Sequence, residues 1–162
     1  MAAHTLAGNS AGFDRFVKTV ELYASQASPG WEGTARFVSR MGADFAHIQP
    51  RDVLRPLRFL RQMAGNPPVR FEVAGFRPDL VDDLNPVRHY MAFLVVGFWL
   101  PALPALLVLA AWEVAGFVRY RGLWSNNDVR SGLVGLRHGR HVRRDGPWAL
   151  PPLLRADLAD RR

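Results

Sequence analysis

The sequence contains no cysteine, which excludes disulfides, thiolate zinc sites, iron–sulfur clusters and cysteine nucleophiles. It also lacks the glycine-rich phosphate loops G-x-x-x-x-G-K-[ST] and G-x-G-x-x-G. Its first residues lack a basic stretch followed by an apolar one, so we expect no secretory signal. His138 and His141 are spaced to share a helix face, but arginines surround them and no carboxylate or thiol lies between them. The sequence therefore predicts no catalytic, cofactor-binding or metal site.

Lysine is nearly absent as well. Lys18 is the single lysine among 21 basic residues, and the formal net charge is +7. The guanidinium group of arginine presents a planar set of donors that suits phosphate and carboxylate oxygens. A GC-rich genome would give the same bias without functional meaning, so the composition leaves both explanations open.

Charge is missing from residues 90–112, a long and mostly apolar run. A helix rises about 1.5 Å per residue, so about 20 apolar residues cross the roughly 30 Å hydrocarbon core of a bilayer. With its flanks, region 85–124 is therefore predicted to be a transmembrane segment. Pro101 and Pro104 near its middle predict a kink or a break, because proline lacks an amide donor and clashes one turn back.

The two prolines leave more than one topology open. One is a kinked single pass, and another is a re-entrant hairpin with its tip at Pro101 and Pro104. Arginines are in excess after the segment, so the positive-inside rule places the C-terminal side in the cytoplasm. A single pass would put the residues before the segment on the other side, whereas a hairpin would keep both flanks cytoplasmic. A buried pair of helices in a globular fold is the third possibility.

The residues before this segment predict a mainly α-helical fold with short amphipathic helices. Apolar side chains recur at helical spacing over residues 10–25 and 33–48. Residues 51–63 place an arginine face opposite an apolar face, as in helices that lie in a membrane interface. Residues 69–73 alternate apolar and polar, as a short strand would, but one isolated strand cannot make a sheet, so an extended loop is the alternative.

A basic helix is predicted after the segment, with Asn126, Asn127 and Asp128 as candidate N-caps. Its glycines fall on nearly one face at the small-xxx-small spacing that lets helices approach closely. We predict a helix-packing interface at Gly132, Gly135 and Gly139. The expected organisation is a disordered 1–10, a helical soluble or membrane-surface domain at 11–84, a transmembrane segment with flanks at 85–124, a basic amphipathic helix at 125–145 and a loosely held Pro/Arg-containing tail at 146–162.

Arginines cluster at the end of the apolar segment and along the basic helix. Such juxtamembrane clusters attract anionic lipid headgroups or other phosphates, and the apolar segment favours lipid over nucleic acid. The predicted contact residues are Arg119, Arg121, Arg137, Arg140, Arg143 and Arg144. The cluster could instead act only as a topology signal. Glu113 and His89 lie at the edges of the apolar segment, where ionisable groups are costly and often functional, and the sequence leaves their role open.

Taken together, these features predict a non-catalytic, membrane-anchored accessory or scaffold subunit of a larger membrane assembly. Its expected partners are membrane lipid and other membrane protein subunits. The alternative is a membrane-active effector or pore former that inserts the apolar segment and binds anionic lipid. A membrane-associated enzyme that uses His89, Glu113, His138 or His141 is a third hypothesis, which no motif supports.

Overall fold

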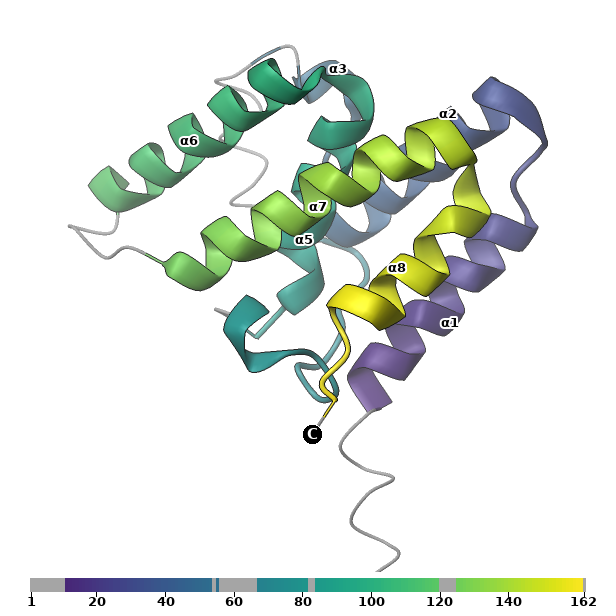
Figure 1. Cartoon of the computed structure of the whole chain (residues 1–162), viewed down its shortest axis with the longest axis horizontal. Coiled ribbons are helices and arrows are strands. Elements are labelled where there is room, and N and C mark those ends of the chain that lie inside the picture. Colours follow the sequence, from purple (N-terminus) through teal and green to yellow (C-terminus); the bar gives the residue numbers. More distant parts are fainter. Residues whose placement is uncertain (1–10, 54, 56–66, 82–83, 120–124, 162) are drawn as a thin grey trace, which may run out of the picture.

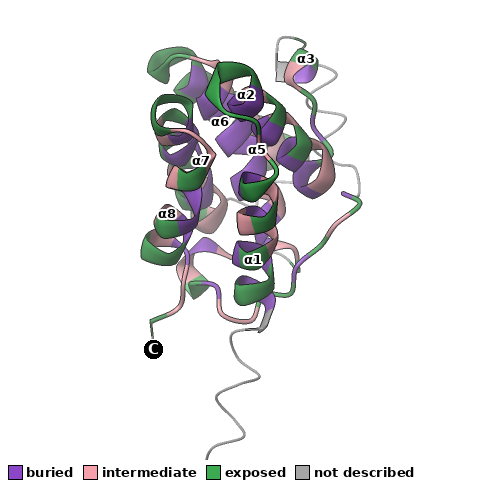
Figure 2. Cartoon of the chain, turned by 90° about the vertical axis from the view of Figure 1, so that its right-hand side faces the viewer, coloured by how far each residue is buried: buried purple, intermediate pink, exposed green. Residues whose placement is uncertain are grey.

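The computed structural model describes residues 11–53, 55, 67–81, 84–119 and 125–161. Over these residues the chain is mainly helical, which confirms the predicted fold class at that level (Figure 1). The predicted disorder of 1–10 and most of the arginine-faced helix at 51–63 fall outside the described residues. Colouring by burial shows helices whose inner faces are buried around one core and whose outer faces are exposed (Figure 2).

The N-terminal half forms two of the predicted amphipathic helices. Helix α1 spans Ala11–Ser25, and helix α2 spans Gly30–Met41 and continues into a π-helical turn at Gly42–Ala46. A short helix α3 follows at Pro50–Val53. The predicted apolar stripe of α1 is buried: Phe13, Phe16, Val17, Val20 and Ala24. Edge-to-face contacts of the Phe16 ring with Phe45 and Phe71 tie this stripe to the rest of the core.

The long apolar run is divided between two helices. Helix α5 spans Pro86–Trp99 and helix α6 spans Ala102–Arg119. Leu100 between them has φ −104° and ψ 147°, the extended conformation that a following proline imposes, and Pro101 supplies no amide to continue the ladder. Within the described ranges, no helix combines the length and the apolar composition needed to cross a bilayer. The break at Leu100 and Pro101 agrees with the kink or break predicted from the two prolines, but the predicted transmembrane segment at 85–124 is corrected to two separate helices, neither of which could span a bilayer.

Helix α5 forms the centre of the fold, and α7 (Asn126–Asp145) crosses it at close range. The glycines of α7 face α5, so that the two backbones touch. A Cβ atom added at Gly139 would lie 2.6 Å from the amide nitrogen of Phe98, and one added at Gly135 would lie 3.0 Å from that of Leu94. Gly97 of α5 meets the Leu136 backbone in the same way. The apolar surface of α5 is thus covered within the chain.

Two local expectations need correction, and one open alternative is decided. The α7 N-cap is Ser125, whose hydroxyl accepts from the Asp128 amide at 3.1 Å, one residue before the predicted candidates. Of the two alternatives for residues 69–73, the structure has the loop, because no neighbouring segment pairs with them; the described chain has only an isolated bridge between Phe76 and Ala159.

The expected loose tail is instead a packed helix. Helix α8 spans Leu150–Asp157 and lies against α1 and α7 (Figure 1). Leu150 and Leu154 are fully buried, and Arg155 pairs with Glu21 of α1 at 2.6 Å.

Candidate functional site

Helix α6 presents a large apolar surface to the outside. We call it the outer face of α6, and it consists of Leu103, Leu106, Leu107, Ala110, Val114, Phe117 and Val118, all exposed. Val118 is 73% exposed and Leu103 is 69% exposed. None of these side chains carries a hydrogen-bonding group. A helix that is apolar around its whole circumference is normally enclosed by protein or by lipid, yet α6 is enclosed on one side only.

The inner side of α6 packs on α5 and α7 through Ala105, Leu109 and Glu113. Glu113 is only 8% exposed, and its Oε1 lies 3.6 Å from Nε2 of His89 on α5. The other ring nitrogen of His89 lies 3.9 Å from Oδ1 of Asp128 on α7. The described carboxylate of α6 is therefore turned inward and its apolar side chains outward, the reverse of an ordinary surface helix.

His89 joins the three helices at one point. Burial lowers the pKa of His89 to about 3, and the neighbouring charge of Arg88 acts in the same direction. The imidazole is therefore neutral at physiological pH. In the described part of the chain, no three His, Asp or Glu side chains are placed to hold a metal ion. These polar side chains meet where α6 packs on α5 and α7.

The predicted lipid-contacting arginines have different environments. Arg137 pairs with Asp157 at 2.8 Å, and Arg144 pairs with Asp145 at 2.8 Å. Arg140 is exposed and makes no ion pair with any described residue. Arg121 and the side chain of Arg119 lie outside the described residues. Neighbouring carboxylates therefore neutralise part of the cluster.

Arg143 has a third kind of environment. Its Nη1 donates to the carbonyl oxygen of Phe98 at 3.2 Å, near the C-terminal end of α5. That end carries the negative pole of the helix dipole, so the cation is favourable there. The structure thus gives Arg143 a role inside the fold beside any role at a surface.

The predicted glycine interface has its partner within the chain. Gly135 and Gly139 contact α5, and Gly132 also approaches Leu109 of α6. This surface is therefore not free for another subunit. His138, a weak candidate for a metal ligand or an enzyme residue in the sequence, is fully buried between Tyr90 and Asp157. Its place in the heptad-like spacing with Gly135 and Val142 was the available signal for burial.

Comparisons of the chain with protein-family profiles, with curated proteins and with solved structures found no match.

Proposed function

We propose that this protein is a non-catalytic accessory protein that docks on a lipid bilayer through the outer face of α6. The observation that carries the proposal is the row of exposed apolar side chains on a helix whose carboxylate is turned inward. In this arrangement α6 lies along the membrane surface with its apolar side chains among the acyl chains. The remaining helices stay above the membrane and present their surfaces to other proteins.

The chemistry of the outer face favours lipid over a protein partner. A protein–protein interface typically contains a hydrogen bond for every 100–200 Å² or so, and aromatic and arginine side chains are enriched at its centre. The outer face consists of Leu, Val, Ala and Phe, and it offers no hydrogen bond. The hydrocarbon core of a bilayer is an environment in which such a surface needs no hydrogen bonds. Burying one such Leu or Val side chain contributes roughly 1.5–3 kcal/mol, so several together give stable docking.

The positive charge of the chain supports binding to a bilayer that contains anionic lipid. Helix α7 runs beside α6, and its exposed side carries Arg130, Arg137 and Arg140 (Figure 1). Each cation near an anionic membrane surface contributes about 1 kcal/mol. Arg140 offers the strongest contribution of these, because Arg137 pairs with Asp157 at 2.8 Å and Arg130 lies 3.8 Å from Asp79. We therefore expect tighter binding to anionic than to zwitterionic bilayers.

Vesicle co-sedimentation of the full chain tests this proposal. The probes are vesicles of phosphatidylcholine with and without phosphatidylglycerol. Wild-type protein should sediment with the vesicles, more strongly with the anionic ones. The double substitution Leu107→Glu and Val118→Glu should weaken binding by at least about tenfold, since it places two charges on the outer face. The matched control is Leu22→Glu with Val73→Glu, two exposed apolar residues outside α6, and it should bind as wild type does.

Three outcomes would contradict the proposal. In the first, neither type of vesicle binds the protein. In the second, the α6 variant converts a dimer into a monomer in analytical ultracentrifugation while vesicle binding stays absent, which would assign the outer face to a second copy. In the third, the protein releases a dye trapped in the vesicles, which would favour the pore-forming alternative.

A further inference from the structure

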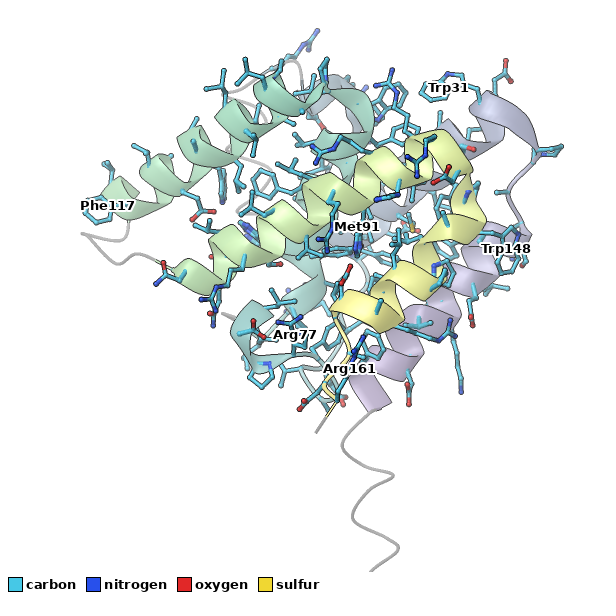
Figure 3. All side chains as sticks on the ribbon, in the orientation of Figure 1. Trp31, Arg77, Met91, Phe117, Trp148 and Arg161 are labelled. Carbon is cyan, nitrogen blue, oxygen red and sulfur yellow. The ribbon has the colours of Figure 1, made fainter. Side chains whose placement is uncertain are left out.

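A cleft of about 550 Å³ lies where the ends of four helices meet, away from α6. Its walls come from the α1–α2 turn, the start of α2, the end of α7 and the segment that leads into α8. Trp31 and Trp148 are on this side of the molecule, whereas Phe117 of α6 is at the other end of the long axis (Figure 3). A ligand in the cleft would therefore not compete with docking through α6.

Two tryptophans dominate the cleft. The side chains of Trp31 and Trp148 are 50% and 58% exposed, which is unusual for the largest apolar side chain. Neither indole N–H donates to an acceptor in the described part of the chain. Trp31 is held in place by stacking on Phe98, with ring centroids 5.2 Å apart. Each tryptophan follows a turn that depends on glycine, since Gly30 and Gly146 have φ of 84° and 86°.

The charges of the cleft favour a ligand with a single negative group. The guanidinium of Arg143 lies 5.6 Å from the centre of the Trp31 ring, and its bond to the Phe98 carbonyl fixes its position. Arg144 also lines the cleft, but Asp145 binds it through both carboxylate oxygens at 2.8 Å. The lining therefore has a net charge of about one positive unit beside Trp31.

We propose that this cleft binds a proline-rich peptide segment in the polyproline II conformation, next to an acidic residue. Proline rings stack on exposed aromatic side chains. A polyproline II helix has no internal hydrogen bonds, so all carbonyl oxygens of the peptide are free to accept hydrogen bonds. The two indole N–H groups are the donors that such carbonyls require. Arg143 pairs with the carboxylate of the acidic residue and fixes the direction of the peptide.

Nucleic acid fits the same features less well. A strand brings one negative charge per nucleotide, and its affinity depends on several free cations along the backbone. Here one arginine is neutralised by Asp145, whose carboxylate lines the cleft and would repel phosphates. The neutral, rigid backbone of a polyproline segment avoids this repulsion and has little conformational entropy to lose.

Fluorescence anisotropy with a dye-labelled decaproline that ends in two aspartates tests the proposal on the full chain. We expect saturable binding, and Trp148→Ala should weaken it by about tenfold or more. Trp148 makes no ring contact with a described residue, so this variant should keep its fold. Phe117→Ala removes another exposed aromatic side chain, from α6, and should leave peptide binding unchanged. Arg143→Gln should weaken the acidic peptide several-fold and a neutral decaproline much less.

Two reference probes make the result decisive. A Gly/Ser peptide with the same two aspartates should not bind, because it lacks both the rings and the fixed conformation. A thymidine decanucleotide should bind more weakly than the acidic decaproline. The proposal is wrong if the Gly/Ser peptide binds equally, if the oligonucleotide binds more tightly, if Trp148→Ala has no effect, or if decaproline does not saturate. None of these results depends on vesicle binding, so the cleft and the outer face of α6 are tested separately.

Discussion

The hydroxyl group of Tyr90 lies 2.8 Å from Nδ1 of His138, and both side chains are almost completely buried. Nε2 of His138 lies 2.8 Å from Oδ2 of Asp157. A carboxylate only accepts hydrogen bonds, so Nε2 carries the proton and Nδ1 accepts from Tyr90. Burial lowers the pKa of His138 and raises that of Tyr90 well above its usual value, so both are neutral at physiological pH. One row of hydrogen bonds thus connects α5, α7 and α8.

Replacing Tyr90 by Phe should lower the free energy of unfolding by about 1–3 kcal/mol, because Nδ1 of His138 would lose its donor in a place that water does not reach. Urea denaturation with matched protein concentrations measures this loss. Tyr23→Phe is the control, since the Tyr23 hydroxyl donates to Asp44 at 2.8 Å in a half-exposed position. We expect a loss below about 1 kcal/mol there. Equal losses for the two variants would show that the Tyr90 bond is not a buried one.

Because α5 and α7 cross at close range, adding one methyl group to a glycine at the crossing should have a large effect on the free energy of unfolding. Gly139→Ala should destabilise the fold by about 1–3 kcal/mol or more, because the new Cβ would lie within 2.6 Å of the Phe98 backbone, which cannot rotate away. Gly116→Ala on α6 should do the opposite. It meets open space there, and alanine is favoured over glycine in a helix by roughly 0.5–1 kcal/mol. Thermal and urea unfolding of the two variants check both signs, and a stabilising Gly139→Ala would contradict the close crossing.

His89 predicts a loss of stability in acid. Its pKa is about 3 in the fold, below the value of about 6.5 in an unfolded chain, so the unfolded state binds a proton first. The contribution of His89 to the free energy of unfolding is fully present above about pH 6.5. It decreases toward pH 3, by up to about 1.4 kcal/mol per pH unit. Arg88, Glu113 and Asp128 are the charged groups around the ring.

Urea midpoints between about pH 4 and 7 measure this slope. His138 contributes a slope of the same sign, since burial also lowers its pKa. His89→Gln should therefore reduce the wild-type slope without abolishing it. An unchanged slope in His89→Gln would show that His89 is not held neutral in the fold.

Because α8 packs against the core, we expect its residues to contribute to the stability of the fold. Leu154→Ala should cost about 2–5 kcal/mol, because the side chain is fully buried and its removal leaves a cavity. Leu153→Ala, next to it but half exposed, should cost clearly less. Hydrogen exchange of the α8 amides gives a second measurement. A loose tail would show no difference between the two variants and no protection.

Local signals in the sequence predicted the helices well. The spacing of Phe13, Phe16 and Val20 placed α1 within one residue of its observed bounds, because a helical stripe is visible over a short window. The prolines of α8 misled the prediction. Pro151 and Pro152 suggested a loose tail, but they lie in the first turn of the helix, where no amide donor is needed.

Long-range contacts could not be predicted in the same way. An apolar run has the same composition whether a bilayer or another helix covers it, and the structure covers α5 with the glycine surface of α7. The pairing of His138 with Asp157 and the cleft between Trp31 and Trp148 each join segments distant in the sequence. Periodicity gives the face of a helix but does not identify the partner of that face.

The break at the extended Leu100 and the following Pro101 divides the apolar run into a core helix, α5, and a surface helix, α6. Before this point, a change of side chain in α5 alters the core and therefore whether the chain folds at all. After it, the outward side chains of α6 are exposed, so a change among them alters the surface of the molecule and leaves its core in place. Substitutions there can therefore raise or lower the apolar character of this surface while the fold stays the same.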